Sequence, residues 1–174
     1  MSVVADLKRY LSERNVRFWT FSEMDVKRSS NGRIISSAHE SMVRPVILRI
    51  NNQYVVMILE HSEEVDLEKM KYLLNVKSIQ PVLDKDYERL FPGCEQSLLP
   101  LSRNFYNLRI YCSRKIMMRE NICLNICTTG EMIKLSVDDF LKLAKPTIGS
   151  FTRPAAKVFE KNKANQRQDM VIEV

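Results

Sequence analysis

Two apolar runs near the middle of the chain constrain its fold more than any other feature. Residues 45–50 and 54–59 are rich in valine, isoleucine and leucine, and three polar residues, Asn-Asn-Gln, separate them. β-branched side chains favour strands, and two such runs joined by a short polar connection are typical of an antiparallel hairpin. Because both runs are almost continuously apolar, we predict that this hairpin passes through the core of a sheet.

Helical patterns stand on both sides of these strands. Apolar residues recur at helical spacing over residues 3–15, and Asp66 is suited to cap a helix over residues 67–74. Ser136 stands three residues before an aspartate, close to a capping box, and predicts a last helix that Pro146 ends. Shorter helices are predicted at residues 34–43 and 84–91.

The other strand signals are interleaved with these helices. We predict strands at residues 16–22, 107–112, 122–127 and 131–135, and turns at residues 29–33 and 128–130. Several predicted strands are neighbours in sequence. This order indicates an α+β fold with a central mixed or antiparallel sheet and flanking helices, and it argues against a doubly wound parallel sheet.

The length and composition of the chain indicate how many domains it has and what kind of partner and location to expect. A chain of 174 residues suits one domain, which we place at residues 3–151, and residues 152–174 form a polar C-terminal tail or linker. The net charge of +6 favours an acidic partner, with nucleic acid first, although the basic residues are dispersed. No apolar run approaches the ~20 residues that span a bilayer, and nothing resembles a signal peptide. We therefore expect no membrane association and a cytoplasmic location.

The cysteines do not have the spacing of a metal site. Cys94, Cys112, Cys123 and Cys127 contain no CxxC pair. In a cytoplasmic protein they are expected to be reduced thiols that pack as small hydrophobes. We predict neither a metal nor a cofactor.

Three further segments carry a resemblance to a known family. Residues 91–101 read FPGCEQSLLPL, residues 106–111 read YNLRIY and residues 124–136 read LNICTTGEMIKLS. Their order and spacing resemble the YbaK-type aminoacyl-tRNA editing family, which also supplies the editing insertion of bacterial prolyl-tRNA synthetases. The upstream segment VRPVILR, at residues 43–49, is similar to a fourth family segment. The resemblance covers roughly residues 3–151 and implies a YbaK-like, prolyl-tRNA synthetase editing-domain-like fold.

The resemblance also implies a substrate and a set of site residues. Such domains hydrolyse the ester between an amino acid and the terminal ribose of tRNA, using a lysine, a glycine-containing turn and no metal. A histidine follows a further glycine and a threonine in the family. The lysine, turn-glycine and histidine positions are occupied here by Arg44, Ser97 and Thr129, which become the candidate catalytic residues. Candidate substrate-binding residues are His39, Leu98, Leu99, Pro100, Cys127 and Thr128.

The changed residues leave other interpretations open. Arg44 can be a surface arginine that ends a helix, Ser97 an ordinary loop serine, and Thr128 and Thr129 part of a hairpin turn. Three functions therefore compete. The chain is an editing hydrolase that clears misacylated tRNA in trans, a catalytically inactive module that binds tRNA, an aminoacyl ligand or a protein, or a regulatory domain whose C-terminal tail contacts a protein partner.

Overall fold

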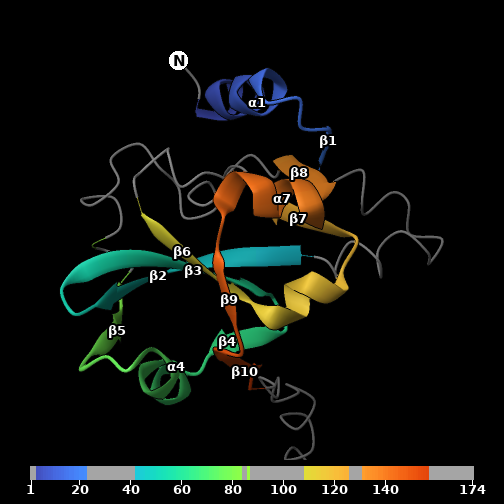
Figure 1. Ribbon diagram of the computed structural model, residues 1–174. Coiled ribbons are helices and arrows are strands. Elements are labelled where there is room, and N and C mark those ends of the chain that lie inside the picture. Colours follow the sequence, from blue (N-terminus) through green and yellow to red (C-terminus); the bar gives the residue numbers. More distant parts are fainter. Residues whose placement is uncertain (1–2, 23–41, 84–85, 87–107, 126–130, 157–174) are drawn as a thin grey trace, which may run out of the picture.

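A mixed eight-stranded sheet organises the residues that the structure describes, which in this computed structural model are 3–22, 42–83, 86, 108–125 and 131–156 (Figure 1). The strands are β1 (Phe18–Ser22), β2 (Met42–Ile50), β3 (Gln53–Glu60), β4 (Glu63–Val65), β5 (Ile79–Pro81), β6 (Arg109–Ser113), β7 (Asn121–Asn125), β8 (Glu131–Ser136), β9 (Thr147–Gly149) and β10 (Thr152–Pro154). The main sheet has the order β1-β8-β7-β2-β3-β6-β9, and β5 also pairs with β2. Strands β4 and β10 form a separate two-stranded sheet.

Both strand orientations occur in the main sheet. Strand β2 runs parallel to β7, β3 parallel to β6, and β6 parallel to β9. The β1–β8, β7–β8, β2–β3 and β2–β5 pairs are antiparallel. The predicted α+β fold with a central mixed sheet is therefore confirmed.

The central hairpin forms where the apolar runs predict it. Strands β2 and β3 pair antiparallel from Val43↔Glu60 to Ile50↔Gln53, so the connection consists of Asn51 and Asn52 alone. Both asparagines have positive φ, 45° and 69°. Two consecutive left-handed residues are the requirement of a type I′ hairpin turn, and asparagine tolerates that conformation. The third polar residue of the connection belongs to β3.

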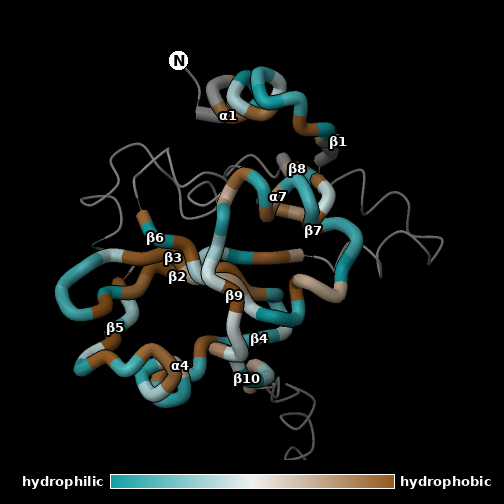
Figure 2. The backbone as a smooth tube through the Cα atoms, in the orientation of Figure 1, coloured by the Kyte–Doolittle hydropathy of each residue, from teal (hydrophilic) through white to brown (hydrophobic). Residues whose placement is uncertain are grey.

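The two faces of the sheet bury two separate apolar clusters. The first core contains Leu7, Leu11, Val43, Ile47, Val56, Ile58, Ile110, Cys112, Ile116, Ile122, Leu124, Ile133, Leu135, Val137, Phe140 and Ala144. The second core contains Leu48, Ile50, Val55, Met57, Leu59, Met70, Tyr111 and Phe151. Alternate residues of β2 and β3 enter opposite cores, as the two-residue period of a strand requires. Figure 2 shows the hydrophobic residues concentrated along these two central strands.

Helices cover both faces of the sheet. Helices α1 (Val3–Glu13) and α7 (Val137–Ala144) contribute to the first core, and α4 (Leu67–Leu74) places Met70 in the second. The two predicted caps are confirmed: Asp66 accepts a hydrogen bond from the Lys69 amide at 3.0 Å and Ser136 accepts one from the Asp139 amide at 3.1 Å. None of the described helices is long and apolar enough to cross a membrane.

The structure corrects one predicted element and adds others. Residues 42 and 43, predicted as the end of a helix over residues 34–43, begin β2 instead, because they pair with β7 and Val43 also pairs with β3. Residues 152–154, predicted as the start of the polar tail, form β10 against β4. The division of the chain into a domain and a tail stays a prediction. The predicted turns at 29–33 and 128–130 and most of the predicted helix at 84–91 lie outside the described residues.

Candidate functional site

Arg44 is the candidate site residue that the structure describes. It lies near the start of β2 rather than at the end of a helix, and it is partly buried. Leu48 and Ile50, an even number of residues further along β2, enter the second core. The alternation of a strand therefore directs the Arg44 side chain to the same face of the sheet. The surface-helix interpretation of this arginine is wrong.

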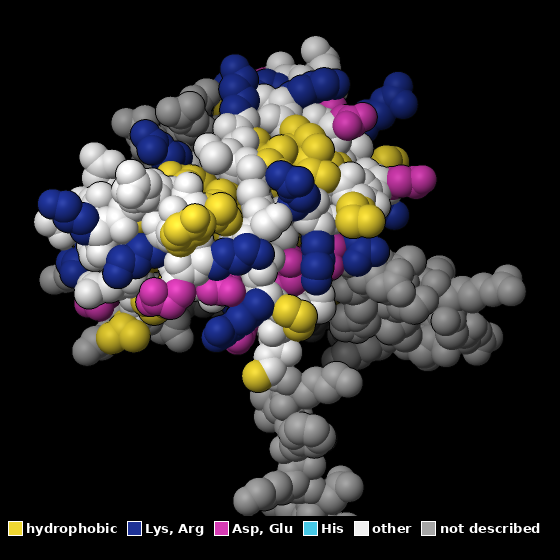
Figure 3. All heavy atoms as spheres, turned by 60° about the horizontal axis from the view of Figure 1, so that its bottom comes forward, with side chains coloured by type: hydrophobic (Ala, Val, Ile, Leu, Met, Phe, Trp, Pro, Cys, Tyr) yellow, Lys and Arg dark blue, Asp and Glu magenta, His cyan; other side chains and the backbone are white. Residues whose placement is uncertain are grey.

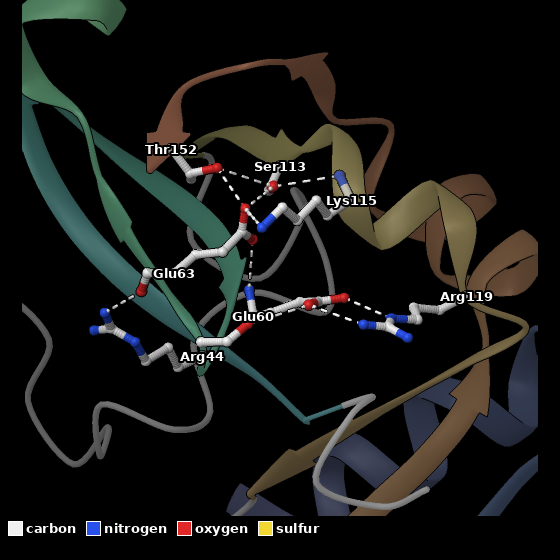
Figure 4. Close-up of polar contacts among 8 residues, drawn as sticks. Arg44, Glu60, Glu63, Ser113, Lys115, Arg119 and Thr152 are labelled. Atoms are coloured by element: carbon white, nitrogen blue, oxygen red, sulfur yellow. Dashed lines mark hydrogen bonds and ion pairs between the residues drawn. The ribbon is translucent and has the colours of Figure 1, made fainter. Parts of the chain in front are cut away.

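The guanidinium of Arg44 is fixed by a main-chain acceptor. Its Nη2 donates to the carbonyl oxygen of Glu63, the first residue of β4, at 2.9 Å (Figure 4). Within the described part of the chain this is the hydrogen bond that Arg44 makes. An arginine has several N–H donors, so others stay available to a ligand. The side chain is therefore oriented, and no carboxylate among the described residues pairs with it.

The carboxylate of Glu63 is buried and has donors on both oxygens. Its Oε1 accepts hydrogen bonds from Thr152 Oγ1 at 2.5 Å and from Ser113 Oγ at 3.0 Å. Its Oε2 accepts one from the Glu60 amide at 3.2 Å. The Lys115 ammonium lies 3.7 Å from Oε1 and is half exposed. Burying a carboxylate is costly unless its lone pairs are satisfied, and these donors satisfy them.

A second buried carboxylate, that of Glu60, pairs with Arg119. Arg119 Nε lies 2.7 Å from Glu60 Oε1 and its Nη2 lies 3.2 Å from Oε2, a two-pronged contact. The Glu60 side chain is 4% exposed and that of Arg119 is 35% exposed. Such planar pairing is the geometry in which arginine binds carboxylates best. This pair ties the end of β3 to the residue that follows η1 (Arg114–Met118).

These contacts form one group, the polar cluster: Glu60, Glu63, Ser113, Lys115, Arg119 and Thr152 (Figure 4). Its charges are two carboxylates, one ammonium and one guanidinium. Ser113 is 1% exposed, so its hydroxyl is closed to a large substrate. The buried groups of the polar cluster therefore have a structural role, and Arg44 is joined to the cluster through its hydrogen bond to the Glu63 carbonyl.

The two described thiols, Cys112 and Cys123, are buried. Burial, followed by the negative charge of Glu63, raises the pKa of Cys112 to about 12, and Cys123 is also buried. A thiol attacks as its thiolate, which is scarce at neutral pH when the pKa is so high. The prediction that cysteines pack as small hydrophobes is confirmed for these two. Among the described residues no group of three or more His, Cys, Asp or Glu could hold a metal ion.

The main sheet has a division beside Arg44, where one side of β2 changes from pairing with β7 to pairing with β5. On one side of β2, β7 pairs with Met42 and Val43, whereas β5 pairs with residues 48–50. Between these contacts, residues 44–46 have no strand partner on that side within the described ranges. Pro45, which lacks an N–H, suits such a position. In the parallel register Leu124 stands opposite Val43, and β7 ends one residue later, next to Arg44.

The β2–β7 register also concerns the candidate residues that follow β7 in the sequence. Residues 126–130 begin at the end of β7 and include Cys127, Thr128 and Thr129, two to four residues beyond Asn125. Those three residues themselves lie outside the described residues. So do the other candidates from the sequence: His39, Ser97, Leu98, Leu99 and Pro100. Their convergence with Arg44 stays a prediction.

Sequence reasoning did not find the polar cluster. Glu60 ends the apolar strand β3, and Glu63 follows three residues later; this closeness to an apolar run is the one local sign that they are buried. Their partners are distant: Ser113 is 50 residues from Glu63 and Thr152 is 89 residues away. No local pattern connects such residues.

The chain matches one known protein family over most of its length. A family model described as the aminoacyl-tRNA editing domain matches residues 33–143. The chain belongs to the aminoacyl-tRNA editing domain family. The matched range of this editing domain includes Arg44 and the polar cluster except Thr152. The predicted resemblance is confirmed. No curated protein sequence matches the chain.

Solved structures share the editing-domain fold. One is a candidate trans-editing enzyme for prolyl tRNA synthetase, with a TM-score of 0.68 at 10% identity over 88% of this chain and 98% of that one. Another is a candidate signal transduction protein from Marinobacter aquaeolei VT8, with a TM-score of 0.63 at 17% identity. The match covers 80% of this chain but only 28% of that protein. At these identities the similarity establishes the fold alone.

Proposed function

We propose that this editing domain acts in trans on the aminoacylated 3′ end of misacylated tRNA and hydrolyses the ester that links the amino acid to the ribose. Family membership and the net charge of +6 support tRNA as the partner. The observation that carries the proposal is the position of Arg44, a cation oriented by a main-chain carbonyl beside the division in the main sheet. Such a role belongs to translation fidelity, and we assign it to the cytoplasm.

Arg44 supplies the electrostatic part of this chemistry. The planar fork of the guanidinium matches a phosphate or a carboxyl-derived oxygen. In hydrolysis, water adds to the ester carbonyl and negative charge grows on the carbonyl oxygen. The bond from the carbonyl carbon to the ribose oxygen then breaks, and that oxygen takes a proton. Donors fixed around the growing charge lower the barrier.

The remaining site residues follow from the family resemblance. We assign Ser97 and Thr129, together with Arg44, as the catalytic residues. The substrate-binding positions assigned in the same way are His39, Leu98, Leu99, Pro100, Cys127 and Thr128. By the same resemblance, the substrate's own ribose hydroxyl takes part in the hydrolysis of the ester.

A second candidate function is a catalytically inactive module that binds tRNA, an aminoacyl ligand or a protein. The replacement of the family lysine by Arg44 favours it, because a planar fork does not occupy a tight site as a compact ammonium does. A similar fold also forms 28% of a candidate signal transduction protein. The C-terminal tail, residues 152–174, is the segment through which a protein partner or an additional domain is expected to act.

Hydrolysis of charged tRNA separates the two candidates. The wild-type chain is incubated with tRNA mischarged with cysteine, alanine or serine and, as controls, with correctly charged tRNA. The proposal expects release of the amino acid from at least one mischarged tRNA at a rate well above its spontaneous hydrolysis. Retention of every aminoacyl group, together with measurable tRNA binding, establishes the inactive module instead.

A further inference from the structure

We infer that Glu63 is a positioning residue for Arg44 and that Ser113 and Thr152 hold it in place. This inference rests on the proposed function, because it assigns a task to residues that support Arg44 rather than contact the substrate. The Glu63 carboxylate links the small β4–β10 sheet to the main sheet, and the Glu63 carbonyl orients Arg44.

The orientation of Arg44 depends on where the β4 backbone lies. Its guanidinium contacts the Glu63 carbonyl oxygen at 2.9 Å and does not contact the Glu63 carboxylate (Figure 4). A shift of β4 by a fraction of that distance therefore moves the acceptor that fixes Arg44. A hydrogen bond weakens steeply as its length and angle depart from the optimum.

Strand β4 is short, and the polar contacts of Glu63 help to fix it against the main sheet. It has three residues, and its strand partner among the described residues is β10, also of three residues. The turn at residues 61–62 joins β4 to β3, Val65 packs against the second core, and the side chain of Glu63 adds polar contacts. Its Oε1 reaches Ser113 on β6, and its Oε2 reaches the Glu60 amide on β3. One buried carboxylate therefore connects both sheets.

A carboxylate fits this place better than its uncharged analogue. An ionised glutamate only accepts, and Ser113, Thr152 and the Glu60 amide all donate to it. In Glu63→Gln one oxygen becomes an amide nitrogen: at the Oε2 position it meets the Glu60 N–H donor, and at the Oε1 position the two hydroxyls must turn to accept instead of donate. The side-chain volume is almost unchanged, so the main effect is the loss of matched hydrogen bonds.

Thr152 lies outside the range matched by the family model, yet it makes the shortest of these contacts, 2.5 Å to Oε1. Thr152→Val removes the hydroxyl while it preserves the shape and charge of the side chain. It is the gentler of the two variants. Thr147→Val is the matched control, because Thr147 is an exposed strand threonine on β9 and is not a member of the polar cluster.

A double-mutant cycle tests the inference. Glu63→Gln and Thr152→Val are each made in the wild-type chain and in Arg44→Ala, and kcat/KM for mischarged tRNA is measured, with affinity for a non-hydrolysable aminoacyl-RNA hairpin as a second readout. Each variant should lower kcat/KM about tenfold in the wild type but less than about twofold in Arg44→Ala. Thr147→Val should change neither.

The outcomes separate this inference from the proposed function. If Arg44→Ala leaves both turnover and affinity unchanged, the proposed function fails. If Arg44→Ala impairs them but Glu63→Gln and Thr152→Val have equal effects in both backgrounds, the two residues act on general structure and the positioning role fails. If Thr152→Val has no effect in either background while the chain stays folded, the role assigned to Thr152 is wrong.

Discussion

Replacing Arg119 by methionine should destabilise the fold through the charge that it leaves behind. Methionine keeps most of the apolar stem of arginine, and the variant loses the two hydrogen bonds to Glu60 at 2.7 and 3.2 Å. The Glu60 side chain, 4% exposed in the wild type, then loses its guanidinium partner. The dominant effect is therefore the desolvated carboxylate rather than lost packing.

The size of this effect follows from the burial of the two partners. Removing one partner of a fully buried pair costs about 3–5 kcal/mol. Arg119 is 35% exposed, so water can enter the space that it leaves and solvate part of the Glu60 carboxylate. We therefore expect Arg119→Met to lower the free energy of unfolding by about 2–3 kcal/mol.

Urea denaturation, monitored by circular dichroism, measures the change in the free energy of unfolding. Arg114→Met is the matched control, because it removes the same charge from an exposed residue of η1 and should change stability by less than about 0.5 kcal/mol. Adding Glu60→Met to Arg119→Met removes the unpaired charge and should recover most of the loss. If Arg119→Met is no less stable than Arg114→Met, or if the double variant is the least stable, the reasoning is refuted.

Three further predictions concern other parts of the chain. Burial raises the pKa of Cys112 from 9.0 to about 12, so the unfolded chain releases this proton first as pH rises. Between those two pH values the wild type should lose stability relative to Cys112→Ala in urea titrations, and parallel curves would exclude the effect. Basic side chains are spread among acidic ones on the face seen in Figure 3, so affinity for tRNA should be weak and should fall linearly with salt on logarithmic axes. Salt-independent binding, or no binding at low salt, would contradict this. Arg44→Lys combined with Ser97→Gly should raise deacylation, since it restores a compact cation and a turn without a β-carbon; slower turnover than the wild type would count against it.

Local chemistry predicted the larger elements of this fold. The central hairpin follows from two β-branched runs around a pair of asparagines, and the helices at Asp66 and Ser136 follow from their capping side chains. The sequence pattern does not predict the start of β2, because residues 42–43 are too few to show a strand period on their own. Their pairing with β7 joins segments that are about 80 residues apart in the chain and overrides local propensity.

The short strands and the polar cluster could not be predicted for a related reason. Strands β4, β5 and β10 have three residues each, too few for a hydrophobic period to appear. The burial of Glu63 exists only because Ser113 and Thr152 approach it from distant segments. Arg44 was identified through its place in a family segment, whereas its orientation depends on the Glu63 carbonyl, which no side-chain pattern reveals.

The most direct test of this account compares two arginines on the same strand. Arg44→Ala and Arg49→Ala each remove one positive charge from β2, but Arg49 is exposed and donates to Gln80 at 2.8 Å, away from the division beside Arg44. Deacylation of mischarged tRNA should fall by at least about a hundredfold in Arg44→Ala, the scale of losing a fixed donor to a developing oxyanion, and should change less than about twofold in Arg49→Ala. Equal turnover in the two variants would contradict the central claim that Arg44 is the functional cation of this editing domain.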